Sequence, residues 1–314
     1  MTRYILSRLV AMCITLFIIL TIAFMVVRLM PGSVYDNPEY SIEIIQALEA
    51  KAQLDKPWII QYFHFLKGAL RGDWGVSVKI APCVPVFDVI KQRIPITILL
   101  NIISLVISLP IGILAGTVAA MNRSRMPDHI ISFLVVNFIS VPSFVFATLM
   151  QYFLAFKAGW FPIVYSATAA GTAKYRSMML PMLALSFGPI ATVTRYLRGE
   201  LIENLSSEYM LLARTKGLTK YQAAFRHAFR NSCVPLANII IPMFTGILGG
   251  SLVVERIFAI PGVGGLMVES VSTSDHFLTV AVLLFYSVIS LFTILLVDIS
   301  YGIIDPRIRL GGNE

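Results

Sequence analysis

Six long runs of apolar residues without a charged side chain restrict the fold of this chain more than any other feature of its sequence. A helix needs about 20 predominantly apolar residues to cross a bilayer core, so each uncharged run of at least roughly 18 residues is a candidate transmembrane helix. The runs are residues 9–27, 94–122, 130–156, 177–194, 231–254 and 277–297. They predict an all-α polytopic membrane protein with six transmembrane helices.

The composition supports a membrane-embedded chain, because 57% of the 314 residues are apolar, 13% are charged and the mean hydropathy is +0.80. Soluble domains carry about 25% charged residues. We expect residues 1–30 to form an N-terminal tip and the first helix, and residues 31–93 a long connection. Residues 94–314 then form the transmembrane core, with the loop 198–230 as its largest inner connection.

Basic residues predict the orientation, because lysine and arginine are enriched in short cytoplasmic connections. With the N-terminus inside, the inner segments hold Arg3, Arg8, Arg123, Arg125, Arg195, Arg198, Arg214, Lys216, Lys220, Arg226, Arg230, Arg307 and Arg309. Both termini are then cytoplasmic, and residues 31–93 face the outside of the cytoplasmic (inner) membrane. The net charge of +8 therefore reflects topology rather than a nucleic-acid partner.

The sequence offers no catalytic centre. It lacks a P-loop, a nucleophile elbow and the glycine spacing of a dinucleotide-binding turn. The three cysteines and four histidines are scattered along the chain, without the spacing of a metal site. We therefore expect no enzyme activity, no metal and no cofactor in this chain.

The loop 198–230 reads as a helix, a turn and a second helix. The first helix begins near Glu208 and is amphipathic, Gly217 suits a left-handed residue after its end, and Thr219 suits the cap of the next helix. Residues 221–230 form the second, basic helix. An ordinary positive-inside loop is the alternative interpretation.

The residues EYM-x-x-AR-x-KGL at 208–218, followed by FRHAFRN at 225–231, resemble the coupling loop of ABC importer permeases. The resemblance is to the dipeptide, oligopeptide and nickel permease family in particular. In the general importer pattern a glutamate and two alanines precede the glycine, whereas this chain has Leu211, Leu212 and Ala213 there. The Ala-Arg-x-Lys-Gly core of the peptide permeases fits better.

Further motifs of the same family recur in the expected order along nearly the whole chain. They are Pro31-Gly32, Gly72-Asp73-Trp74-Gly75-x-Ser77, Ile260-Pro261-Gly262-Val263-Gly264 and Asp305-Pro306-Arg307-Ile308-Arg309. The resemblance implies a type I (MetI-like) permease fold and ATP-driven import by alternating access. It also implies partners: a second homologous permease subunit, two cytoplasmic ABC ATPase subunits, an extracytoplasmic substrate-binding protein and membrane lipid.

Within this family the loop would seat on an ATPase and convert ATPase closure into movement of the membrane helices. The residues expected to carry this coupling are Leu211, Leu212, Ala213, Arg214, Gly217, Arg226 and His227. Ala213 and Gly217 would permit close approach, and the basic side chains would form polar contacts across the joint.

Asp298 lies near the inner end of the last run, where an unpaired carboxylate would be costly. We expect a buried partner, Arg195 or Arg198, and prefer a structural pair to a gate.

The long connection 31–93 contains two candidate short helices, residues 41–51 and 57–70. It would either dock the binding protein or cap the permease itself. The resemblance favours peptides as substrates, with nickel or a metal chelate as the alternative. A self-sufficient secondary transporter would need ion-coupling carboxylates or an internal repeat, and neither is visible.

Overall fold

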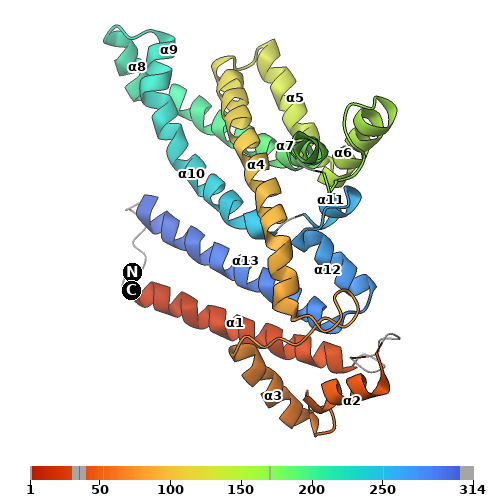
Figure 1. Ribbon diagram of the computed structural model, residues 1–314. Helices are drawn as coiled ribbons and strands as arrows, with labels where there is room; N and C mark the ends of the chain where they lie inside the picture. Colours follow the sequence, from red (N-terminus) through yellow and green to blue (C-terminus); the bar gives the residue numbers. More distant parts are fainter. Residues whose placement is uncertain are drawn as a thin grey trace. The chain divides into compact units, whose positions relative to one another are not determined.

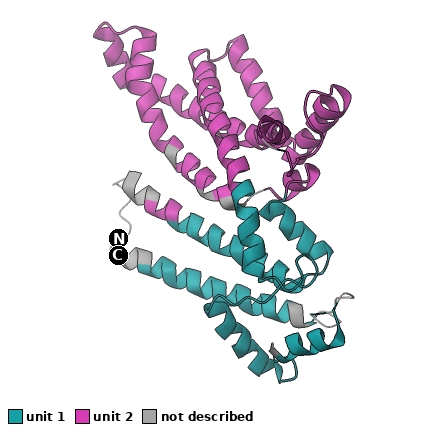
Figure 2. Cartoon of the chain, viewed as in Figure 1, with its two compact units in different colours: residues 1–97, 261–295, 310–314 teal, residues 98–260, 296–309 magenta. Residues whose placement is uncertain are grey.

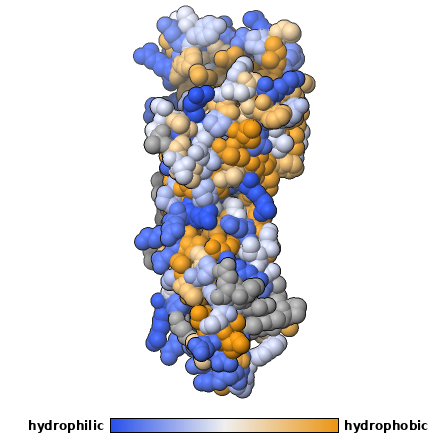
Figure 3. Space-filling view, turned by 45° about the vertical axis from the view of Figure 1, so that its right-hand side comes forward, coloured by the Kyte–Doolittle hydropathy of each residue, from blue (hydrophilic) through white to orange (hydrophobic). Residues whose placement is uncertain are grey.

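The computed structural model describes residues 2–29, 35, 40–51, 53–169, 171–249 and 251–304. Over these residues the regular secondary structure is helical, and one isolated antiparallel bridge joins Val76 to Pro85 (Figure 1). Hydrophobic side chains cover broad areas of the surface (Figure 3), as a surface in contact with lipid requires. The predicted all-α membrane fold is confirmed.

Within the described residues, four helices are long and apolar enough to cross a membrane, and they correspond to four of the six predicted runs. Their bounds are α1 (Thr2–Leu29), α4 (Val86–Met121), α7 (Thr172–Leu205) and α13 (His276–Ile304). Pro181 and Pro189 lie inside α7 without ending it, since neighbouring membrane helices can satisfy the backbone groups that proline frees.

The run 130–156 is not one straight helix as predicted. Helix α5 (Met126–Ser140) and the following segment, residues 143–157, are bent by 101° at the short break between them. The segment consists of α6 (Ser143–Met150) and the π-helical turn η1 (Gln151–Lys157). Proline disfavours helical backbone in the residue before it; Val141 accordingly is extended, and Pro142 caps α6.

The run 231–254 is also divided. Helix α10 (Phe229–Thr245) is followed by the 3₁₀ turn η3 (Gly246–Gly249) and by α11 (Leu252–Ile257). Glycine is a poor helix former, and Ser251 caps α11 by accepting a hydrogen bond from Val254 N at 3.4 Å. The described residues thus contain four spanning helices, or five if the bent pair counts as one span. The predicted count of six is not confirmed.

The chain forms two compact units (Figure 2). Unit 1 comprises residues 1–97, 261–295 and 310–314, and unit 2 comprises residues 98–260 and 296–309. The predicted division at residues 30 and 93 followed transmembrane topology rather than packing and stays a prediction.

Unit 1 contains α1, α2 (Ile42–Lys51), α3 (Trp58–Leu70), the first part of α4, α12 (Val263–Ser272) and most of α13. Helices α2 and α3 confirm the two short helices predicted in the long connection. The main core joins the start of α4 to α12 and α13 through Val86, Ile90, Leu266, Leu278 and Val282.

Helix α3 is fixed to α1 by aromatic packing and one hydrogen bond. The ring centroids of Phe24 and Tyr62 lie 5.3 Å apart, and those of Phe24 and Phe65 lie 5.5 Å apart. The hydroxyls of Thr21 and Tyr62 are 2.7 Å apart. The long connection therefore packs onto the first transmembrane helix through α3.

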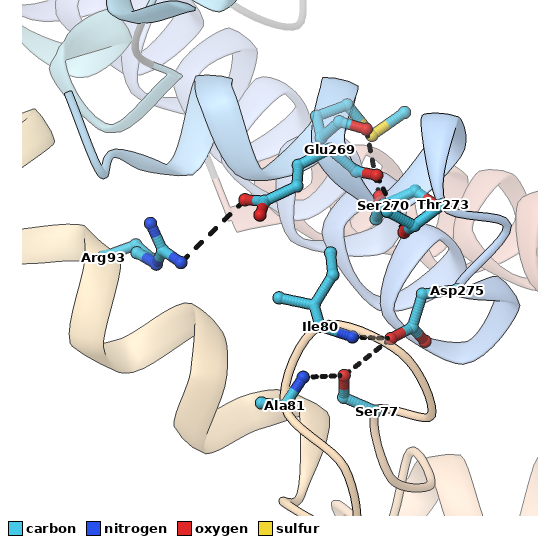
Figure 4. A network of polar contacts seen from close by, with 9 residues as sticks. Ser77, Ile80, Ala81, Arg93, Glu269, Ser270, Thr273 and Asp275 are labelled. Carbon is cyan, nitrogen blue, oxygen red and sulfur yellow. Dashed lines mark hydrogen bonds and ion pairs between the residues drawn. The ribbon is translucent and has the colours of Figure 1, made fainter. Parts of the chain in front are cut away.

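A buried carboxylate holds a second part of the long connection (Figure 4). Asp275, which is 0% exposed, precedes α13, and its Oδ2 accepts four hydrogen bonds. One comes from Ser77 Oγ at 2.6 Å, and three come from the backbone N–H groups of Val78, Lys79 and Ile80 at 3.0–3.2 Å. We call residues 77–80 with Asp275 the Asp275 anchor.

Unit 2 contains the rest of α4, the helices from α5 to α11 and the end of α13. Its α4 and α7 approach closely because small residues, among them Gly112 and Gly116, line their contact. A Cβ on Gly112 would lie 2.8 Å from Val193 Cβ, and one on Gly116 would lie 2.9 Å from Thr194 O. Ser104 Oγ donates to Met182 O at 3.0 Å across the same contact.

Replacing Asp275 by asparagine should destabilise unit 1, because the buried charge that accepts four hydrogen bonds is lost. We expect a loss of about 2–4 kcal/mol, the range for removing charge-assisted bonds at a buried site, and faster proteolysis within residues 77–81. Thermal unfolding and limited proteolysis of the purified protein in detergent measure both effects. Asp55→Asn, at an exposed carboxylate of the same connection, is the control. Equal melting temperatures for the two variants would contradict this account.

Candidate coupling site

The predicted helix, turn and helix between residues 198 and 230 is present in unit 2. Helix α8 (Glu208–Thr215) is followed by Gly217 with φ +92°, as predicted. Thr219 then caps α9 (Lys220–Ala223) in a reciprocal pair of bonds: its Oγ1 accepts from Gln222 N, and Gln222 Oε1 accepts from Thr219 N. The sequence signals for both ends of the turn are thus confirmed.

The second helix does not end at residue 230. Helix α9 passes into the π-helical turn η2 (Ala224–Ala228) and then directly into α10. In Figure 1, α8 and α9 lie at one end of unit 2, beyond α10. The connection between the two predicted runs therefore begins as the end of α7, ends as an extension of α10, and has α8 as its separate part.

A cluster of small and apolar side chains anchors α8 to the rest of unit 2. Met210 and Ala213 of α8 are buried with Ala120 of α4 and Leu201 of α7, and the other members are Ala223 and Ala228. The small side chains allow the helices to approach closely. Ala213, expected to permit the approach of a partner, instead faces this internal cluster.

Asn204, near the end of α7, joins three helices by its side-chain amide. Its Nδ2 donates to Glu200 O at 2.9 Å and to Ser232 Oγ of α10 at 3.1 Å. Its Oδ1 accepts from the hydroxyl of Tyr209 of α8 at 2.6 Å. Lys220 Nζ adds a bond to Met121 O at the end of α4, at 3.2 Å. These bonds fix α8 and α9 to the ends of α4, α7 and α10.

The opposite side of the segment is exposed and partly apolar. Leu211 and Leu212 are 68% and 57% exposed, and Tyr221 and Phe225 are also exposed. The remaining predicted coupling residues, Arg214, Gly217, Arg226 and His227, are exposed too. Six of the seven predicted residues are therefore accessible to a partner, and Ala213 is not. Exposed apolar side chains outside the spanning segments are typical of interaction sites.

An ion pair between the buried Asp128 and the partly exposed Arg198, which sequence reasoning did not find, holds the same end of α7 to α5. The guanidinium of Arg198 contacts Asp128 with both branches, Nε to Oδ1 at 2.6 Å and Nη2 to Oδ2 at 2.9 Å. Asp128 is 2% exposed and also accepts from Ser124 N at 2.9 Å. The only sequence signal was an acidic residue in the first turn of α5.

The two candidate partners of Asp298 therefore differ. Arg198 is engaged by Asp128, whereas Arg195 is an exposed residue of the same helix. The pair of Asp298 with Arg195 stays a prediction. Among the described residues, no three His, Cys, Asp or Glu side chains are grouped to hold a metal ion.

Arg198→Leu should destabilise the protein by about 3–5 kcal/mol, because it leaves the Asp128 carboxylate buried without its counter-charge. The double variant Asp128→Leu/Arg198→Leu removes both charges and should recover part of this loss. Thermal unfolding of the purified variants tests the coupling, with Arg123→Leu, at an exposed cation, as the control. Additive losses in the double variant would show that the pair is not the cause.

These features define a polytopic α-helical membrane protein in which an exposed helix–turn–helix is fastened to the ends of several long helices. The description "Binding-protein-dependent transport system inner membrane component" matches residues 108–310, and the N-terminal model of the same transport systems matches residues 1–101. The chain belongs to this family of inner-membrane permeases, whose fold is the MetI-like fold.

Relatives match over the full length of the chain. The dipeptide transport system permease protein DppB of Lactococcus lactis subsp. cremoris (strain MG1363) is 40% identical over 310 residues, covering 99% of this chain and 100% of that protein. DppB of Bacillus subtilis (strain 168) is 36% identical over 311 residues, 99% of each chain. The oligopeptide permease OppB of Haemophilus influenzae is 34% identical over 310 residues, covering 98% and 100%.

The chain is therefore a transport subunit and not an enzyme. A binding-protein-dependent system of this family includes a substrate-binding protein and ATPase subunits, and ATP hydrolysis takes place in the ATPase subunits. The prediction of an ABC importer permease, made from the motifs, is confirmed.

Proposed function

We propose that this chain is a permease subunit of an ATP-driven importer that carries dipeptides or oligopeptides across the cytoplasmic membrane. The observation that carries the proposal is the full-length similarity to dipeptide and oligopeptide permeases, which covers 98–99% of this chain. A second homologous permease completes the translocation pathway, which opens alternately to each side.

The proposed orientation places both termini and the segment 198–230 in the cytoplasm. The positive-inside rule supports it, because this connection carries Arg214, Lys216, Lys220, Arg226 and Arg230. The long connection 31–93, with α2, α3 and the Asp275 anchor, then lies on the extracytoplasmic side. The segment 198–230 thus faces the ATPase subunits, and the connection 31–93 faces the substrate-binding protein.

In this proposal α8 is the element that binds an ATPase subunit. Leu211 and Leu212 enter an apolar cleft of the ATPase, and Arg214, Arg226 and His227 make polar contacts around it. The buried Met210 and Ala213, with Asn204, link α8 to α7 and α10. A displacement of α8 therefore moves the ends of those helices, rather than bending a flexible loop.

Peptide uptake provides the direct test of the substrate class. In cells that depend on this system, deletion of the permease should abolish uptake of a radiolabelled dipeptide, and a plasmid copy should restore it. Uptake of a free amino acid serves as the control, because it uses other carriers. Undiminished dipeptide uptake in the deletion strain would exclude the proposed substrate.

Leu211→Arg/Leu212→Arg should leave the protein folded in the membrane but reduce uptake at least about tenfold, since each buried apolar side chain contributes about 1.5–3 kcal/mol to an interface. The ATPase subunits should also no longer copurify with the permease. Copurification and transport in vesicles are the measurements.

Leu211→Met/Leu212→Met is the matched control, because methionine keeps the apolar contact and the approximate volume. It should retain both uptake and copurification. If the arginine variant transports like the methionine variant, α8 does not carry the contact.

A further inference from the structure

Unit 1 contains a pocket that the transport mechanism described above does not use. It lies beside α3, residues 73–76 and the start of α13, and its volume is about 100 Å³. One water needs about 10–15 Å³ of such volume. The pocket therefore has room for the end of one side chain but not for a whole peptide. Its polar lining comes from Gln61, His64 and Asp73.

Gln61 of α3 lines this pocket and carries a buried hydrogen-bond acceptor without a partner among the described residues. The side chain is 5% exposed, and its Nε2 donates to Leu54 O at 3.0 Å and to Lys56 O at 2.7 Å. These two carbonyls fix the amide orientation, because the reverse orientation would place oxygen against oxygen. Gln61 Oε1 is left buried without a hydrogen-bond partner among the described residues. Such an acceptor is unfavourable until a donor reaches it.

Asp73 adds a negative charge at the exposed edge of the pocket. Its Oδ1 accepts from Gly75 N at 3.2 Å, which fixes the carboxylate against the turn. Gly75 itself has φ +88°, and a Cβ there would lie 2.9 Å from Phe277 Cδ1. Only glycine combines this backbone conformation with so close an approach of the aromatic ring.

Aromatic rings form much of the remaining wall. Tyr35 and Phe277 stack with centroids 5.1 Å apart, and Phe65 and Trp74 also line the pocket. The indole N–H of Trp74 donates to Ala69 O at 3.2 Å, so its donor is already used. None of the described lysine or arginine side chains lines the pocket.

A carboxylate and an amide oxygen among aromatic faces form a site for a cation that carries N–H donors. Aromatic faces attract ammonium and guanidinium groups, and both groups carry several N–H donors for such acceptors. An anionic or purely apolar group would leave Gln61 Oε1 without a donor.

We infer that this pocket binds the cationic head of a lysine or arginine side chain from the substrate-binding protein and so helps to seat that protein on the permease. The inference rests on the proposed function, which places residues 31–93 outside the membrane. The pocket's size selects a single side chain, and the charge of Asp73 selects a basic one.

The test uses the complete transporter, with both permeases and both ATPases, in lipid nanodiscs. The concentration of binding protein that gives half-maximal ATPase stimulation should rise about tenfold in Asp73→Asn, the effect of losing one charge-assisted hydrogen bond. Asparagine retains the acceptor for Gly75 N, so the turn stays formed. Asp55→Asn, an equal charge change elsewhere in the same connection, should alter that concentration less than twofold. Equal stimulation curves for wild type and Asp73→Asn would overturn the inference, whereas a wild type that no binding protein stimulates would overturn the proposed function as well.

A second measurement tests whether the pocket binds a cation in the absence of the binding protein. In a Trp58→Phe/Trp160→Phe background, methylguanidinium should change the emission of Trp74 saturably, and the neutral isostere methylurea should not. Asp73→Asn should weaken the methylguanidinium response, at constant ionic strength. The same response to both compounds, or none to either, would show that the pocket does not select a cation.

Discussion

In a bilayer core no water is present to bond a free backbone N–H or C=O, and this constraint determines where the chain can depart from helix. The four long helices satisfy it by their own backbone bonds, except where prolines such as Pro181 and Pro189 free a group. At the bent pair α5–α6 and its π turn, the chain interrupts the helix and supplies bonds from side chains. Gln151 Nε2 donates to Ile163 O at 2.8 Å and to Ile257 O at 3.1 Å, and thereby ties the turn to residues before α7 and at the end of α11. The irregular backbone around η1 thus has hydrogen-bond partners within unit 2 itself.

In the segment 198–230, buried residues hold α8 in place and exposed residues form its contact surface. The buried members are small or hydrogen-bonded internally, as Ala213 and Asn204 illustrate, and they determine how α8 is held. The exposed members, Leu211 and Leu212 above all, are free to contact another protein. A helix held in this way can transmit force because its anchors reach α4, α7 and α10, while its contact surface can change without disturbing the core.

Sequence reasoning predicted the features that depend on local chemistry. Uncharged length predicted α1, α4, α7 and α13, and the positive φ of Gly217 and the cap at Thr219 followed from residue type. It did not find the 101° bend, because hydropathy carries no information on helix direction and Pro142 lies inside an uninterrupted uncharged run. The Asp128–Arg198 pair joins residues 70 apart in sequence, and the bonds of Asp275 join residues nearly 200 apart. Only the folded chain shows which charges meet.

The contacts around Asp275 also explain how a small pocket can be ready to bind. Residues 77–80 are held by the Asp275 carboxylate, and the pocket residues Asp73 and Gly75 precede them in the same connection, while Phe277 follows Asp275 by two positions. The buried Asp275 carboxylate therefore fixes both the segment that carries Asp73 and the aromatic ring of Phe277, which lines the same pocket. The entropic cost of ordering these groups arises on folding and not on association. A single side chain that enters the pocket can therefore contribute usefully to binding.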